Sequence, residues 1–213
     1  MYADRIEAGL ALADQLKKYA GNPGVVLAVP RGGVPLGYII ARELKMPMEI
    51  LLSKKIGHPH NPEYAIGAVS LTDRIIIHHE GVSDEYIESE TERIREKLKE
   101  NYKKFMGNNK PNDLENKIVI IVDDGIATGN TLLSAVKMLR HKRPAKIVIA
   151  APVASRSSVE KLSKFADEMV IPLIPKAFYG VGGFYEDFEQ VSDEEVLSYL
   201  DKQGKNTANQ KNE

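Results

Sequence analysis

Two adjacent acidic residues, Asp123 and Asp124, directly follow the apolar run IVIIV. Neighbouring carboxylates raise each other's pKa unless a cation or hydrogen-bond donors lie close to them. Such a pair therefore needs hydroxyl donors, a metal ion or both. This acid pair, as we name Asp123 and Asp124, is the first candidate for a ligand site.

The turn that follows the acid pair could bind phosphate through its backbone. Residues 125–131 read GIATGNT, in which two glycines permit backbone conformations that other residues avoid. Thr128 and Thr131 add hydroxyls, and a helix beginning near Thr131 would present free amides at its N-terminus, where phosphate commonly binds. A diol clamp beside a phosphate cradle is what a ribose 5-phosphate requires. The glycine spacing of this phosphate turn (residues 125–131) does not match the nucleoside-triphosphate loop or the dinucleotide fingerprint.

The elements that must position these residues alternate between strands and helices. Short apolar runs have the composition of strands buried on both faces of a parallel sheet, at residues 25–29, 118–122 and 146–151. Each is followed by a turn and a segment with helical periodicity, at residues 34–44, 131–141 and 156–165. The pattern predicts an α/β fold with a doubly wound, mainly parallel sheet and helices on both faces. Ligands bind such sheets beyond the carboxyl ends of the strands, so the turns at Pro30 and Asp123 should share one edge.

The run VIIVDDGIATGNT, residues 119–131, resembles the phosphoribosyl diphosphate (PRPP) motif of type I phosphoribosyltransferases. The resemblance implies that the acid pair holds the ribose hydroxyls of PRPP and that the following turn holds its 5-phosphate. The residues assigned in this way are Asp123, Asp124, Gly125, Ile126, Ala127, Thr128, Gly129, Asn130 and Thr131. The alternative, an ordinary strand-to-helix turn with a capping aspartate, explains one acid but not the whole run.

A second run, VPRGGVPLG at residues 29–37, is similar to the short pyrophosphate-binding loop of the same family. An arginine supplies positive charge, and two glycines let backbone amides approach an anion closely. Alone this is a weak glycine-rich turn, but the predicted sheet places it on the same edge as the acid pair. The resemblance assigns the pyrophosphate of PRPP to Pro30, Arg31, Gly32 and Gly33.

Residues 53–63 form a polar segment between an apolar run at 49–52 and a predicted hairpin at 65–78. We interpret it as a flexible loop, and the resemblance implies a hairpin lid that closes over the pyrophosphate. Lys54 and Lys55 are expected to take part in catalysis with the acid pair, because departing diphosphate needs compensating charge. Two solvated lysines are the alternative. The histidines of this segment and of the hairpin end, His58, His60, His78 and His79, are more simply surface residues than a zinc site, since no further ligand stands at metal spacing.

Aromatic residues are concentrated in residues 176–190, among three glycines. The resemblance implies a small hood over the acceptor base, and aromatic rings stack well on flat heterocycles. The acceptor pocket is therefore assigned to Lys176, Phe178, Tyr179, Phe184 and Tyr185. Core aromatics that anchor a C-terminal extension are an equally good explanation.

Composition narrows the function further. The 213 residues contain 29 Lys and Arg against 30 Asp and Glu, so no global positive field favours nucleic acid or an anionic membrane. There is no cysteine, which excludes disulfides, thiol catalysis and iron–sulfur clusters. With no signal-peptide pattern and no long apolar run, we expect a cytoplasmic protein. One domain over residues 1–202 is predicted, with a disordered tail at 203–213.

The runs SKKIGHPHNPEYAIGAV (residues 53–69) and YGVGGFYEDFEQVSDEEV (179–196) resemble a group of phosphoribosyltransferases of unsettled acceptor. The resemblance implies a homodimer that binds PRPP and a small heterocyclic acceptor. The implied reaction is Mg²⁺-dependent displacement of pyrophosphate from PRPP by a nitrogenous acceptor, with the acid pair near the metal, through water. A non-catalytic PRPP sensor is the alternative. A phosphatase or receiver-like site would leave the phosphate turn unused.

Overall fold

The computed structural model describes residues 1–77 and 81–210. Its core is a five-stranded sheet in the order β2-β1-β6-β7-β8, and every neighbouring pair is parallel. The strands are β1 Gly24–Ala28, β2 Met48–Ile50, β6 Ile118–Val122, β7 Lys146–Ala150 and β8 Glu168–Val170. The prediction of a mainly parallel α/β sheet is confirmed.

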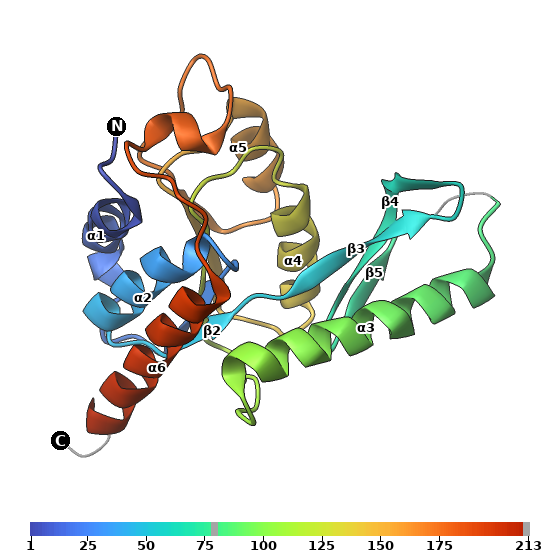
Figure 1. Ribbon diagram of the computed structural model, residues 1–213, viewed down its shortest axis with the longest axis horizontal. Helices are drawn as coiled ribbons and strands as arrows, with labels where there is room; N and C mark the ends of the chain where they lie inside the picture. Colours follow the sequence, from blue (N-terminus) through green and yellow to red (C-terminus); the bar gives the residue numbers. More distant parts are fainter. Residues whose placement is uncertain (78–80, 211–213) are drawn as a thin grey trace.

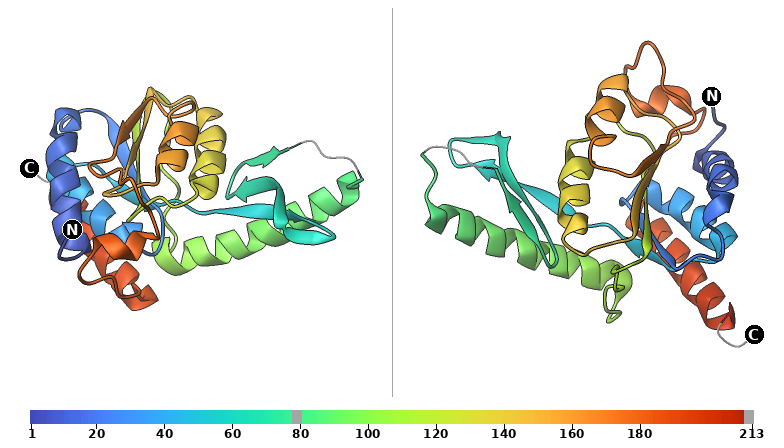
Figure 2. Two further views of the ribbon diagram at one scale, coloured as in Figure 1. Left: turned by 90° about the horizontal axis from the view of Figure 1, so that it is seen from above. Right: turned by 180° about the vertical axis from the view of Figure 1, so that it is seen from behind.

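Helices cover both faces of this sheet because successive strand residues point to opposite sides. Val26 and Ile120 face one cluster of buried side chains, which includes residues of α1, α2 and α6. Val25 and Val119 face a second cluster, which includes residues of α4 and α5. Figures 1 and 2 show these two helical layers on either side of the strands. The helices are α1 Arg5–Leu16, α2 Gly33–Leu44, α4 Asn130–Arg140, α5 Arg156–Leu162 and α6 Asp193–Gln210, with 3₁₀ turns at Lys17–Tyr19 and Val181–Phe184.

A separate arm extends away from the core sheet (Figure 1). Three antiparallel strands, β3 Ser53–His58, β4 Asn61–Ser70 and β5 Arg74–Ile76, pack on the long helix α3 Asp84–Met106. The expected hairpin is therefore present as β4 and β5, although its predicted last residue, His78, lies outside the described residues. The expectation of a loop at residues 53–63 was wrong, since most of this segment is strand. A strand that packs on a single helix needs few buried side chains, and in β3 only Ile56 is fully buried.

The C-terminal helix is longer than the sequence indicated. Its start is a capping box, in which the amide of Ser192 donates to Glu195 Oε2 at 2.8 Å and the amide of Glu195 donates to Ser192 Oγ at 3.1 Å. The helix then continues to Gln210, so the prediction of a disordered tail was wrong for residues 203–210. Buried Gln203 donates from Nε2 to the carbonyl of Met46 at 3.0 Å, which ties this end to the core. None of the described helices combines the length and the apolar character needed to cross a membrane.

Candidate active site

The turns after β1 and β6 lie against each other because these strands are neighbours in the sheet. The amide of Val29 donates to the carbonyl of Val122 at 2.8 Å. Beyond it, the backbone of Gly32 lies so close to Asp124 that an added Cβ would stand 1.9 Å from Asp124 Oδ2. At Gly33 an added Cβ would stand 2.5 Å from the carbonyl oxygen of Val122. Both glycines are thus required by the close approach of the two turns, which share one edge of the sheet as predicted.

The acid pair lies in a poorly solvated position at this edge. The amide of Asp124 donates to Asp123 Oδ1 at 2.9 Å. Burial, and next the neighbouring Asp124 carboxylate, raises the pKa of Asp123 well above its usual range. Burial also raises the pKa of Asp124, and the guanidinium of Arg5 opposes that rise. Hydroxyl donors or a cation beside the pair would favour its ionised form, as the sequence pattern indicated.

Arg5, at the start of α1, is the cation that the structure places beside the acid pair. Its Nε and Nη2 both lie 2.9 Å from Asp124 Oδ2, and its Nη1 donates to the carbonyl of Glu189 at 2.8 Å. The guanidinium also lies over the ring of Phe188, 4.0 Å from its centroid. The side chains of Arg5 and Asp124 are only 11% and 14% exposed, so this ion pair is largely shielded from water. Sequence analysis missed Arg5, because no local pattern links it to a residue 119 positions later.

The segment before α6 closes over the acid pair. Tyr185 is 5% exposed, and its hydroxyl donates to the carbonyl of Asp124 at 2.7 Å. Burial raises the pKa of Tyr185, so this phenol stays protonated as a donor. A cavity of about 480 Å³, the rim cavity, lies between this segment and the two turns. Its lining is Arg5, Arg31, Gly32, Asp124, Val181, Phe188, Gln190 and Val191.

The phosphate turn leads into α4 with its amides available. Gly129 has a φ of +68°, a left-handed conformation that favours glycine, and α4 begins at the next residue. Within the described residues, no acceptor receives a hydrogen bond from the backbone amides of residues 127–131. Two carbonyls of the turn, by contrast, accept hydrogen bonds from side chains at the start of α5 and within it. Ser155 Oγ donates to the carbonyl of Ala127 at 2.6 Å, and Lys161 Nζ donates to the carbonyl of Thr128 at 2.8 Å.

A buried carboxylate pair beside a glycine turn and a helix N-terminus with free amides is the arrangement that the PRPP motif requires. A family model described as the phosphoribosyl transferase domain matches residues 4–189. The chain belongs to the phosphoribosyl transferase domain family. The prediction made from the two sequence motifs is confirmed at the level of the family.

Individual relatives of this phosphoribosyl transferase domain agree with the assignment. A predicted phosphoribosyl transferase of Mycobacterium tuberculosis is 34% identical over 208 residues, which are 95% of this chain and 47% of the relative. The chain thus spans about half the length of that relative. Uracil phosphoribosyltransferase of Mycoplasma genitalium is 32% identical over 96 residues, 45% of this chain and 41% of that protein. The crystal structure of a Thermus thermophilus protein has a TM-score of 0.85 at 34% identity, covering 95% of this chain and 98% of that one.

Some of the predicted site residues do not contact the acid pair in this conformation. Lys54 and Lys55 are exposed on β3, in the arm, and neither lines the rim cavity. Their role in catalysis stays a prediction. His58 and His60 lie where β3 ends and the chain turns into β4, and the amide of His60 donates to His58 Nδ1 at 3.2 Å.

The five residues assigned to the acceptor pocket are dispersed. Tyr185 is buried on the acid pair, Phe178 stacks on Phe184 with ring centroids 5.7 Å apart, and Tyr179 is 98% exposed. Lys176 and Phe178 line a groove of about 580 Å³ along the phosphate turn. The residues of this segment that line the rim cavity are instead Val181, Phe188 and Gln190. Sequence analysis gave weight to aromatic residues, whereas access to the cavity is decided by the path of the backbone.

The donor atoms of this phosphoribosyl transferase domain suit Mg²⁺. Carboxylate oxygens are hard ligands, and Mg²⁺ is commonly anchored through one or two of them while phosphates and water complete its shell. In residues 1–77 and 81–210, no three His, Asp or Glu side chains converge into a metal cage. The acid pair therefore fits an ion that binds together with a phosphorylated ligand.

Proposed function

We propose that this domain displaces pyrophosphate from PRPP by a nitrogenous, nucleobase-like acceptor. The observation that supports this proposal most is the contact of Gly32 with Asp124. Through this contact the glycine-rich loop at residues 30–33 lies against the acid pair, and the phosphate turn follows the acid pair directly. A ribose ring with phosphates on C1 and C5 matches this order of groups. The family assignment supports the same class of reaction.

The proposed roles follow from the chemistry of each group. Asp123 and Asp124 accept hydrogen bonds from the ribose hydroxyls, and the amides of residues 127–131 donate to the 5-phosphate. The amide of Ile126 is not available for this role, because it donates to the carbonyl of Val153 at 3.0 Å.

Arg31, through its guanidinium and its amide, and the amide of Gly32 receive the pyrophosphate. Pro30 has no N–H, and the amide of Gly33 donates to the carbonyl of Val29 at 2.9 Å. The bond from C1 to the pyrophosphate oxygen breaks, a bond from C1 to the acceptor nitrogen forms, and the N–H proton of the acceptor passes to water. Positive charge develops on the ring in between, so these residues act by holding the sugar, stabilising the leaving anion and excluding water.

Mg²⁺ is the proposed cofactor, and when bound it would neutralise part of the diphosphate charge. The acid pair would hold it, directly or through water. The chain's own contribution is to keep these carboxylates ionised when the ligand arrives. Arg5 serves this role because it opposes the rise that burial causes in the pKa of Asp124.

The acceptor is proposed to enter the rim cavity. Gln190 offers one hydrogen-bond donor group and one acceptor, which can match the edge of a heterocyclic base. Val181 and Phe188 add apolar walls for a flat ring. A homodimer is proposed as the functional form on the basis of the family resemblance.

A screen of purine and pyrimidine bases for pyrophosphate release tests the proposal. The protein is incubated with PRPP, Mg²⁺ and one base at a time, and pyrophosphate is measured with a coupled assay. Release with at least one base, absent without PRPP, is the expected result. Tight PRPP binding with no release for any base would contradict the enzyme and favour the PRPP sensor.

A further inference from the structure

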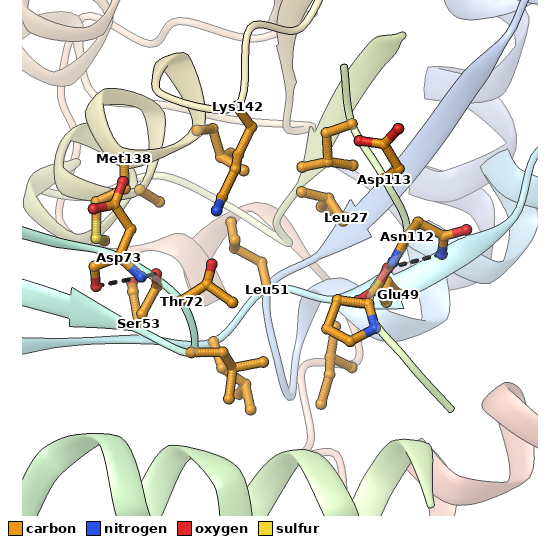
Figure 3. Close-up of a pocket in the computed structure, with 18 of the residues that line it drawn as sticks. Leu27, Glu49, Leu51, Ser53, Thr72, Asp73, Asn112, Asp113, Met138 and Lys142 are labelled. Carbon is orange, nitrogen blue, oxygen red and sulfur yellow. Dashed lines mark hydrogen bonds between the residues drawn. The ribbon is translucent and has the colours of Figure 1, made fainter. Parts of the chain in front are cut away.

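A second cavity, of about 480 Å³, lies between the core and the arm (Figure 3). Its walls are the segment after β2, the turn between β4 and β5, residues 110–114 and the C-terminal half of α4. No residue of the acid pair, the phosphate turn or the loop at residues 30–33 lines it. Helix α4 begins at the phosphate turn and reaches this cavity at its other end, so the arm cavity is separate from the candidate active site.

The wall of the arm cavity is mainly apolar. Six leucines line it together with Ile50 and Met138. Removing apolar ligand surface from water is favourable, so a cavity of this size and lining favours an apolar ligand body.

The buried acid at the cavity already has its full set of donors. Glu49 is 5% exposed and accepts from the hydroxyl of Tyr102 at 2.9 Å. Its other oxygen accepts from the amide and the Nδ2 of Asn112, each at 2.8 Å (Figure 3). This carboxylate holds residues 110–114 in place as a wall and has little capacity left for a ligand.

Asp73 and Asp113, the other acids that line the cavity, are engaged to different degrees. Asp73 accepts from the amide of Arg74 at 2.8 Å through Oδ1, and its Oδ2 lies 2.7 Å from Nδ1 of His141. Asp113 is exposed and accepts from the amide of Glu115 at 3.1 Å. Glu49 and Asp73 are therefore parts of the wall, whereas Asp113 is open to solvent.

The two lysines at the cavity have no such partner. In the part of the chain that the structure describes, neither Lys110 nor Lys142 forms an ion pair or a hydrogen bond through its ammonium group. The side chain of Lys142 points into the cavity, toward Leu51 and Thr72 (Figure 3). Lys142, an exposed residue, thus presents an ammonium without an acid partner beside an apolar interior and a hydroxyl.

We propose that the arm cavity binds an amphipathic monoanion, in which an apolar aromatic or aliphatic body carries one carboxylate or sulfonate. The body occupies the leucine-lined interior, and the anionic group pairs with Lys142, with the hydroxyl of Thr72 as a further donor. The site is independent of PRPP and of the acid pair.

The test uses the fluorescent probe 8-anilinonaphthalene-1-sulfonate, which combines aromatic rings with one sulfonate, and the full chain. Saturable binding of one probe per chain is expected, with displacement by decanoate. Lys142→Gln weakens the affinity by roughly tenfold, the usual effect of losing one charge-assisted hydrogen bond. Lys142→Arg restores it, and Thr72→Trp fills the cavity and abolishes binding.

Two controls keep the result specific. Lys99→Gln removes the same charge from the exposed face of α3, outside the cavity, and leaves the affinity unchanged. Asp123→Asn with Asp124→Asn also leaves it unchanged, so failure of the PRPP site and failure of this site are distinguishable.

Absent or non-saturable binding would overturn the proposal, as would equal affinity in wild type, Lys142→Gln and Thr72→Trp. A second copy of the chain could occupy the cavity instead. In that case Thr72→Trp would lower the mass measured by sedimentation while wild type fails to bind the probe, and this outcome also overturns the proposal.

Discussion

The guanidinium of Arg5 directs both Nε and Nη2 to the same oxygen of Asp124, Oδ2, at 2.9 Å each. One carboxylate of the acid pair therefore has a fixed counter-charge before any ligand is bound. The same carboxylate is proposed to accept a hydrogen bond from a ribose hydroxyl. The ion pair with Arg5 therefore helps to determine whether Asp124 is ionised when PRPP binds. A buried charge that loses its partner becomes costly, so Arg5 is the first position to test.

Arg5→Gln should make PRPP binding more sensitive to acid. Arg5 opposes the burial that raises the pKa of Asp124, so its removal raises that pKa further. A larger fraction of Asp124 is then protonated at a given acidic pH, and the loss of affinity on acidification begins at a higher pH than in wild type. We expect affinity near pH 5 to fall by roughly tenfold, about 1.4 kcal/mol. Calorimetric titrations across pH 5–8 measure it, and identical profiles for the two proteins would exclude this role of Arg5.

Gly32→Ala should damage the PRPP site through a steric clash. The new Cβ would lie 1.9 Å from Asp124 Oδ2, so the loop or the carboxylate must move. Displacements of this size typically cost roughly 100-fold in binding or rate. Gly183→Ala is the matched control, because an added Cβ there meets no atom within 4 Å. If both variants bind PRPP like wild type in calorimetry, the two turns are not in contact as described.

Tyr185→Phe should destabilise the fold modestly without altering its core. The substitution removes the hydrogen bond from the phenol to the carbonyl of Asp124, at 2.7 Å, and leaves that carbonyl without this donor. A loss of about 1 kcal/mol in the free energy of unfolding is expected. Tyr179→Phe, at a side chain that is 98% exposed, should have no effect. Urea denaturation compares the two variants, and equal midpoints would show that the phenol of Tyr185 contributes nothing.

The sheet and the edge where the two turns meet could be predicted from the sequence. Strands buried on both faces appear as continuous apolar runs, and their turns are marked by glycines, so the turns of Gly32 and Asp124 could be placed on one edge before any coordinates. The arm was harder to predict. In β3 only Ile56 is fully buried, and a strand with one buried side chain is hard to distinguish from a polar loop.

Long-range contacts could not be predicted. Arg5 reaches Asp124 because α1 packs against α2, the helix that follows the turn after β1, and neither residue's neighbours in sequence reveal this contact. The extension of α6 depends on a contact of the same kind, from Gln203 to the carbonyl of Met46. The acceptor pocket was assigned to Lys176, Phe178, Tyr179, Phe184 and Tyr185, and this assignment stays a prediction. The residues of the same segment that line the rim cavity are Val181, Phe188 and Gln190.

Asp123→Asn should stabilise the protein at neutral pH. Burial raises the pKa of Asp123 above its value in the unfolded chain, so its contribution to stability is fully present below the unfolded pKa and is lost as pH rises through the folded pKa. Asparagine is neutral at every pH and can still accept from the amide of Asp124. We expect a gain of about 1 kcal/mol at pH 7 that disappears toward pH 4. Thermal unfolding at both pH values measures this gain in stability. A variant that is less stable than wild type at pH 7 would contradict the claim that burial of the ionised Asp123 carboxylate destabilises the protein.

Calorimetric titration of PRPP with Mg²⁺ into wild type and into Asp123→Asn with Asp124→Asn tests the central claim most directly. Circular dichroism and thermal unfolding first establish that the double variant is folded. The account predicts saturable binding of one PRPP per chain by wild type and a loss of roughly 100-fold or more in the double variant, since two charged acceptors for the ribose hydroxyls are removed. Equal affinity in the two proteins, or no binding by wild type, would contradict the assignment of the acid pair to the ribose of PRPP.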